Sequence, residues 1–216
     1  MAPLYEEARY DSDTVMTAVE GAMATVHRAV CLSKGLQAFA GFLRLESAPA
    51  DVNRIVAEAV SKTHGAALEA TEVQLALSHA SPVALVDAEM MKEAIAGLVV
   101  VLTRSFEHGA DFLRIETGSL SLGPDDDTLF RPGSYVHFRF HCVGAGAHPD
   151  ALGDTIRPPC AGDRTLQHSR CGLARMAGFV RQSSGHFVLG SCTSEKIDLD
   201  LYLPQVSHPS PFPANA

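Results

Sequence analysis

Histidine and cysteine side chains gather in the last third of the chain, where they suggest metal or redox chemistry. His141 and Cys142 are adjacent, and Cys160, His168 and Cys171 follow at wider spacing. Imidazole and thiolate are the ligands that zinc prefers, so these residues are candidates for a soft-metal or redox site. Against this interpretation, neighbours on a predicted strand point to opposite faces, and a buried cysteine behaves as a small apolar residue. We expect no metal here.

Two shorter patterns also bear on ligand binding. Gly144 and Gly146 form a Gly-x-Gly turn that can cradle a phosphate, although the same pair suits any tight backbone turn. The acidic run from Asp125 to Asp127 suggests a cation site, yet adjacent aspartates in a loop are more typical of a solvated turn. Neither pattern identifies a ligand by itself.

The composition is that of an ordinary globular protein. The chain has 216 residues, of which 46% are hydrophobic and 19% charged, so it can bury a sizeable core. A formal charge of −8 disfavours nucleic acid and anionic membranes as partners, because both require clustered Lys and Arg. The five cysteines are odd in number and lack a C-x-x-C pair, which indicates free thiols. Since no membrane span or export signal is recognisable, we expect a cytoplasmic protein. Separately, we expect no cofactor.

The first element that must position these residues is a long helix. From residue 12 to about 46, apolar residues recur at helical spacing, which predicts one long amphipathic helix. An acidic or serine residue at 11–13 can cap its start, and the segment 47–49 with its proline ends it. The apolar stripe is too long for one small domain to cover, so we expect a homodimer through this helix. The stripe begins with Met16, Val19, Met23, Val26 and Val30.

Shorter elements follow the long helix. A second helix begins after Asp51 and stops at Gly65, and a third begins after Asp87 and ends at His108-Gly109. A Gly-, Pro- and Arg-rich loop extends from about 144 to 170, and the tail beyond residue 204 is predicted to be disordered. The order predicts an α+β two-layer sandwich behind a helical stalk. The other predicted elements are strands at 72–78, 112–117, 135–143, 186–191 and 196–203 and a helix at 171–185.

Several of these segments, in this order, resemble a bacterial sensor histidine kinase. RAVCLSKGLQAFAGFLRLESAPADVNRIVAEAV resembles the second dimerisation helix and its link to the ATP-binding domain, and VALVDAEMMKEAIAGLVVVLTRSFEHG the helix with the asparagine box. RPGSYVHFRFHCVGAGAHPD resembles the aspartate-glycine strand and loop. GLARMAGFVRQSSGHFVLGS, together with LDLYLP, resembles the closing helix and strands. The resemblance implies a histidine kinase-like ATPase (Bergerat) fold, with a stalk at 1–48, the ATPase-like domain at 49–204 and a tail at 205–216.

The chain departs from the family's pattern at the positions that hold the nucleotide. Gly97 and Val101 stand where the resemblance places two asparagines, the second of which holds magnesium, and valine offers no ligand atom. Cys142 stands where an aspartate would bind the adenine amine, although Gly144 and Gly146 keep the Gly-x-Gly turn.

Two further boxes of the family are also changed. Where the pattern has G-x-G-L-G, the chain reads His168-Ser169-Arg170-Cys171-Gly172, so only the last glycine is kept. Ser194 and Lys196 replace the glycines expected between the last two strands. The resemblance therefore implies a degenerate nucleotide pocket at Gly97, Val101, Cys142, Gly144, Gly146 and Gly172.

We expect the reactive histidine of the family to have no counterpart in this sequence. It lies in a helix that precedes the one resembled here, and His27 falls where the pattern has an arginine. We interpret His27 as a surface or interface residue, with phosphorylation as the less favoured alternative. Neither half of an autokinase reaction is then supported.

The leading hypothesis from the sequence is a non-catalytic regulator of two-component signalling, that is, a pseudo-histidine kinase. Besides a second copy, its expected partner is a histidine kinase or a response regulator. One alternative is a divergent ATP-binding kinase or phosphotransfer protein, which would need ATP and magnesium. Another is a small-ligand, metal or redox sensor that uses the remodelled pocket.

Overall fold

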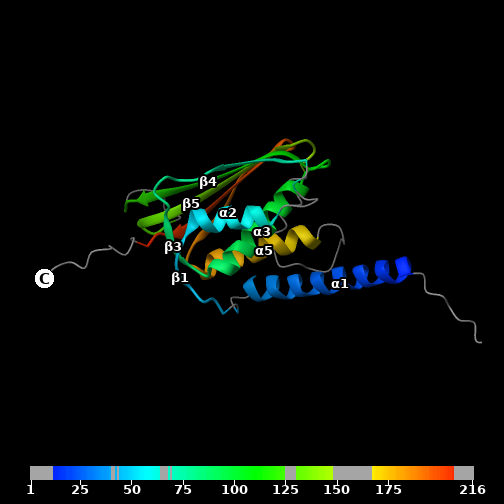
Figure 1. Cartoon of the computed structure of the whole chain (residues 1–216). Coiled ribbons are helices and arrows are strands. Elements are labelled where there is room, and N and C mark those ends of the chain that lie inside the picture. The colour runs from blue at the N-terminus through cyan, green and yellow to red at the C-terminus, as the bar shows by residue number, and fades with distance from the viewer. Residues whose placement is uncertain are drawn as a thin grey trace, which may run out of the picture.

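The computed structural model describes residues 12–39, 42, 44–63, 68, 70–124, 130–147 and 167–206. They form a two-layer α+β sandwich in which three helices cover one face of a mixed five-stranded sheet (Figure 1). This confirms the predicted fold class. The aspartate run 125–127, Gly65, most of the predicted loop with Cys160, and the tail from residue 207 lie outside the described residues.

The sheet has the strand order β2-β4-β5-β7-β6. Only the pair β2–β4 is parallel, and the other three pairs are antiparallel. Apolar and polar residues alternate on the central strands, so that one side of each strand is buried under the helices and the other is not. The strands are β2 (Glu72–Ala76), β4 (Ala110–Leu122), β5 (Gly133–Gly144), β6 (His186–Cys192) and β7 (Lys196–Pro204).

The covering helices are α2 (Val52–Lys62), α3 (Ala88–Arg104) and α5 (Gln167–Gln182). Each places an apolar face on the sheet, and the core includes Leu98 of α3, Phe179 of α5 and Phe140 of β5, all fully buried. The predicted caps are confirmed: Asp51 accepts a hydrogen bond from the amide of Arg54 at 3.2 Å, and Asp87 from that of Met90 at 3.0 Å.

The long helix α1 (Ser12–Phe39) is shorter than predicted, because the helix ends well before residue 46. Residues 44–47 are not helical and lead into β1 (Ala48–Asp51), which pairs antiparallel with β3 (Val83–Val86). The amide of Glu46 donates to the Asp87 carboxylate at 3.0 Å, so contacts with the domain hold this segment out of the helix. Tertiary pairing thus overrides the helical periodicity, and neither β1 nor β3 was predicted.

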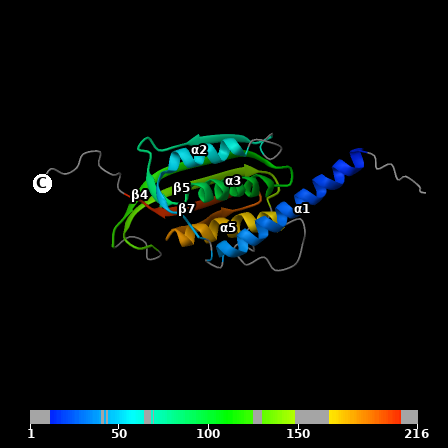
Figure 2. The same ribbon diagram turned by 60° about the horizontal axis from the view of Figure 1, so that its bottom comes forward.

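α1 lies alongside α5 and extends beyond the sandwich (Figure 2). Its apolar stripe is exposed to solvent at every residue from Met16 through Val19, Met23 and Val26 to Val30. These positions alternate in steps of three and four, which is the spacing of a coiled-coil seam. None of the helices in the described part of the chain is both long and apolar enough to cross a membrane.

Candidate functional site

The two α3 positions of the candidate pocket lie one helical turn apart on the same side of the helix. A Cβ added at Gly97 would meet no neighbouring atom within 4 Å, so this position borders open space. Val101 is only 4% exposed, and its carbonyl accepts a hydrogen bond from the Ser105 hydroxyl at 2.7 Å. This side of α3 therefore combines a position with room for a side chain and a packed aliphatic one.

The β5 position of the pocket is sealed in the core. Cys142 is fully buried, and burial raises the pKa of its thiol to about 12. The thiol is therefore protonated at neutral pH, which makes it a poor nucleophile and a poor metal ligand. The neighbouring His141 lies half-buried on the other face of the sheet, as predicted from strand alternation.

The Gly-x-Gly turn is shaped by packing against the end of α3 and the residues that follow it. A Cβ at Gly144 would lie 2.9 Å from ring carbons of Phe106 and 3.1 Å from the Cα of Ala110. Gly146 has a φ of +69°, and its Cβ would lie 2.9 Å from that of Glu107. Both positions thus require glycine for the fold itself, which supports the interpretation as a tight turn.

The turn between β6 and β7 is hydrogen-bonded to this Gly-x-Gly turn. The amide of Gly144 donates to the carbonyl of Glu195 at 3.0 Å, and that of Ala147 to the carbonyl of Ser194 at 2.9 Å. The predicted positions Ser194 and Gly144 are therefore brought together by backbone contacts. These bonds occupy amides that would otherwise be available to an anion.

The α5 part of the pocket is helical rather than a glycine-rich loop. The helix begins at Gln167, before the predicted start, so the backbone of Gly172 lies inside α5. The side chains of His168 and Cys171 lie outside the described set, as do those of His27 and Cys31 in α1. Across the described residues, no three His, Cys, Asp or Glu side chains are grouped to hold a metal ion.

An ion pair that sequence reasoning missed joins α5 to α3 close to the candidate pocket. Arg175 lies 3.6 Å from Glu93, which is one helical turn before Gly97. The arginine side chain is only 13% exposed. The guanidinium thus links α5 to α3. The sequence offered no signal for this pair, because the two residues are far apart in the chain.

A separate groove of about 730 Å³ lies where β1 meets the first turns of α2 and α3. Its lining includes Glu46, Asp51, Arg54, Asp87 and Glu89, and none of the predicted pocket residues. Asp51 and Asp87 are the helix caps, so their carboxylates already accept backbone hydrogen bonds.

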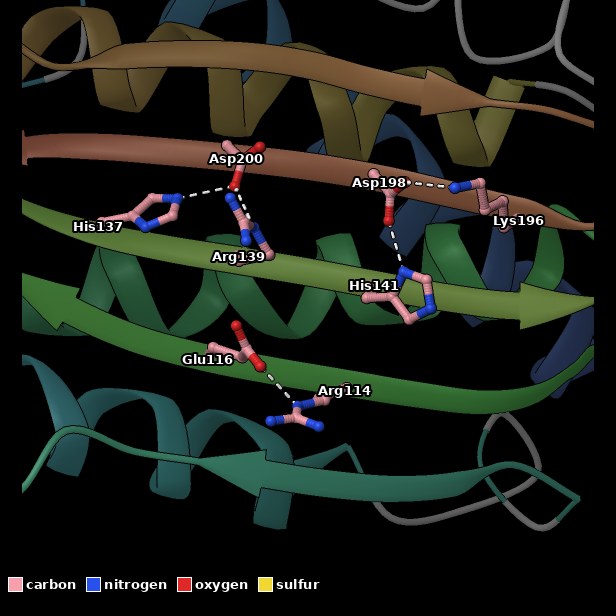
Figure 3. Close-up of polar contacts among 8 residues, drawn as sticks. All are labelled: Arg114, Glu116, His137, Arg139, His141, Lys196, Asp198 and Asp200. Carbon is pink, nitrogen blue, oxygen red and sulfur yellow. Dashed lines mark hydrogen bonds and ion pairs between the residues drawn. The ribbon is translucent and has the colours of Figure 1, made fainter.

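The face of the sheet opposite α2, α3 and α5, which no helix in the described part of the chain covers, carries a polar network that sequence reasoning also missed (Figure 3). His137 Nε2 donates to the Asp200 carboxylate at 2.7 Å and Arg139 Nε to the same oxygen at 3.0 Å, while His141 Nδ1 lies 2.5 Å from Asp198. Burial alone would raise the pKa of Asp200, but the hydrogen bonds from His137 and Arg139 outweigh it and lower that pKa. The only sequence signal for this network is the alternation of polar and apolar residues in HFRFH and DLDLY.

Comparison with known proteins identifies the fold. No protein-family model and no curated protein matches the sequence. Among solved structures, the Acinetobacter baumannii histidine kinase AdeS is similar with a TM-score of 0.66 at 15% identity, over 91% of this chain and 86% of that one. Full-length ShkA in complex with AMPPNP has a TM-score of 0.60 at 17% sequence identity, over 91% of this chain and 40% of that one. The histidine kinase domain of the E. coli osmosensor EnvZ has a TM-score of 0.50 at 20% sequence identity, over 78% of this chain and 94% of that one. The α+β sandwich thus matches the histidine kinase ATPase fold.

Proposed function

We propose that the protein is a non-catalytic regulator of two-component signalling, which uses a histidine kinase-like ATPase scaffold to contact other proteins. The observation that supports this most is Val101. At the position where the family resemblance places the magnesium-holding asparagine, an aliphatic side chain is packed to 4% exposure. A position built into the core in this way offers neither a ligand atom nor room for a metal ion.

The other pocket positions support the same proposal. Cys142, in place of the adenine-binding aspartate, is fully buried, and the two glycines of the turn serve packing. The pair Arg175–Glu93 links α5 to α3. These are packing and ion-pair contacts within the chain, as we expect of a fold kept for its surfaces.

Calorimetric titration with magnesium ATP tests the loss of nucleotide binding. We expect no heat of binding. Full-length ShkA, whose structure is a complex with AMPPNP, serves as the positive control with magnesium AMPPNP. A Kd below about 100 µM would overturn the proposal. Incubation with radiolabelled ATP tests the divergent-enzyme alternative, because label that stays on the protein and is lost in His27→Ala would establish phosphotransfer.

For the protein contacts, we propose that the exposed stripe of α1 pairs with a second copy of the chain. The stripe residues follow coiled-coil spacing, whereas the helix already lies along α5 on another side. An unpaired stripe of this length would expose methionine and valine side chains to water, and pairing removes that cost.

Light scattering on charge variants tests this pairing. Val26→Lys places a charge in the seam and should shift the mass from dimer to monomer. Ala18→Lys, also exposed on α1 but off the stripe, is the matched control and should stay dimeric. An unchanged mass for Val26→Lys, or a monomeric wild type, would refute the pairing.

A further inference from the structure

The groove of about 730 Å³ beside β1 is partly lined by small apolar residues. All four residues of β1 line it, and Figure 1 shows β1 and β3 together at one end of the sandwich. Pro49 has no amide to pair with a further strand, so a molecule in the groove would meet mainly side chains. The apolar part of the lining consists of Ala48, Pro49, Ala50, Val86, Ala88 and Met90.

Charged side chains complete the lining, and their sum is negative. Four carboxylates and one guanidinium give a formal charge of −3, out of −8 for the whole chain. Most of these charged residues are exposed, whereas Val86 is buried and Ala50 and Met90 are half-buried. The groove therefore has an apolar base and an acidic rim. Its charged residues are Glu46, Asp51, Arg54, Asp87 and Glu89.

The neighbouring cations do not neutralise this charge. Arg54 lies 3.5 Å from Glu58, and Lys92 lies 2.9 Å from Glu58 and also pairs with Glu89. Glu58 and Lys92 add one charge of each sign, so the enlarged set keeps its formal charge of −3. The hydrogen bonds to the two capping aspartates come from backbone amides, which carry no formal charge. The N-termini of α2 and α3 contribute about +0.5 each, and the groove stays negative.

Glu46 is the carboxylate of the rim that the helix caps do not explain. Its main-chain amide donates to Asp87 at 3.0 Å, which holds the residue beside the groove. Its side chain is exposed and, in the described part of the chain, forms no ion pair. The Glu46 carboxylate is therefore free to meet a cation from outside.

We propose that this groove binds a basic segment of a partner protein, whose lysine or arginine heads meet Glu46, Asp51 and Glu89. Charge complementarity selects a cationic occupant. Lysine and arginine also carry an apolar stem behind the charged head, so one side chain covers the base and reaches the rim. A metal ion would leave the apolar base uncovered. The inference rests on the proposed protein-contact function and adds a contact surface on elements other than α1.

Fluorescence anisotropy with a short labelled peptide of lysine, arginine and leucine tests this proposal at low ionic strength. We expect saturable binding that weakens as salt rises, and no binding of the peptide in which glutamate replaces each basic residue. Glu46→Gln and Glu89→Gln should each weaken binding roughly two- to five-fold, and the double variant roughly four- to twenty-five-fold.

Glu195→Gln is the matched control, because it removes the same charge from an exposed residue at the other end of α3. Its main-chain carbonyl accepts from the amide of Gly144, which pairs with Ala110 just after that helix. The 17 residues of α3 span about 25 Å, so Glu195→Gln should leave the Kd unchanged. Thermal melting of each variant verifies the fold.

Three results would overturn the inference. They are no saturable binding of the basic peptide, an equal loss of affinity in Glu46→Gln and Glu195→Gln, or displacement of the peptide by calcium or spermine as effectively as by unlabelled peptide. A failed peptide titration together with absent ATP binding would reject this groove and leave the proposed function intact. Peptide binding together with tight ATP binding would do the reverse.

Discussion

Two glycines of the candidate pocket should respond in opposite ways to replacement by alanine. The free energy of unfolding should fall for Gly144→Ala and rise for Gly97→Ala. At Gly144 the new methyl group would meet the Phe106 ring at 2.9 Å and the Ala110 backbone at 3.1 Å, and neither neighbour is a flexible side-chain end. Overpacking of this kind costs about 1–3 kcal/mol, which for a chain of this size lowers the Tm by roughly 3–10 °C. At Gly97 no atom lies within 4 Å, so alanine only adds helix propensity, worth about 0.5–1 kcal/mol.

Urea unfolding followed by circular dichroism measures both changes in the free energy of unfolding. A double-mutant cycle then assigns the cost at Gly144: in a Phe106→Ala background, where the ring is gone, Gly144→Ala should cost less than about 1 kcal/mol. If Gly144→Ala is as stable as the wild type, or if its cost is the same with and without the ring, the packing explanation of the turn is refuted. A destabilised Gly97→Ala would show that position 97 is not open.

The remaining predictions concern titratable groups. The folded pKa of Asp200 lies below its ordinary value, so the carboxylate stabilises the folded state above that ordinary value and loses this contribution as pH falls through the folded pKa. Asp200→Asn should therefore be less stable than the wild type by about 1 kcal/mol at pH 7, and the difference should shrink only below about pH 4; a difference that already vanishes at pH 6 would contradict it. Because burial raises the pKa of Cys142 to about 12, iodoacetamide at pH 8 should leave it unmodified in the folded protein and label it after unfolding, with partly exposed Cys192 reacting first. Mass spectrometry of tryptic peptides follows both thiols, and early labelling of Cys142 would show that the pocket opens.

The sequence predicted the helices and strands whose signals are local and periodic. α3 has a capping residue, Asp87, and an apolar face repeated over several turns, so its start and its buried side were correct. Its end was predicted too late, because the helix stops at Arg104 and not at His108-Gly109. β1 and β3 were missed because each is four residues long and depends on pairing with a segment distant in the sequence. The end of α1 was wrong for a related reason, since contacts such as that of Glu46 with Asp87 are non-local.

The candidate site shows the same division between local and non-local information. The identity of Val101 or Cys142 can be read in the sequence, but their burial depends on the packing of the whole core. The need for glycine at 144 arises from Phe106, on a different element. The network around Asp200 joins strands separated by the whole of α5, and alternation alone marks its residues only as the side of the strand away from the core.

The parallel pairing of β2 has a consequence for the order of folding. β4 and β5 form a hairpin that pairs from Leu122–Gly133 to Ala110–Gly144, with one register shift between Ala110 and Phe112. Its contacts begin at the turn and extend outward. β2 has only one neighbour, β4, and can join it only after α3 has crossed the sheet. The chain loses conformational entropy when this loop closes, and the contacts between β2 and β4 form only afterwards. We therefore expect β2 to dock last and its amides to exchange with deuterium before those of β5, which makes this edge the place where unfolding begins.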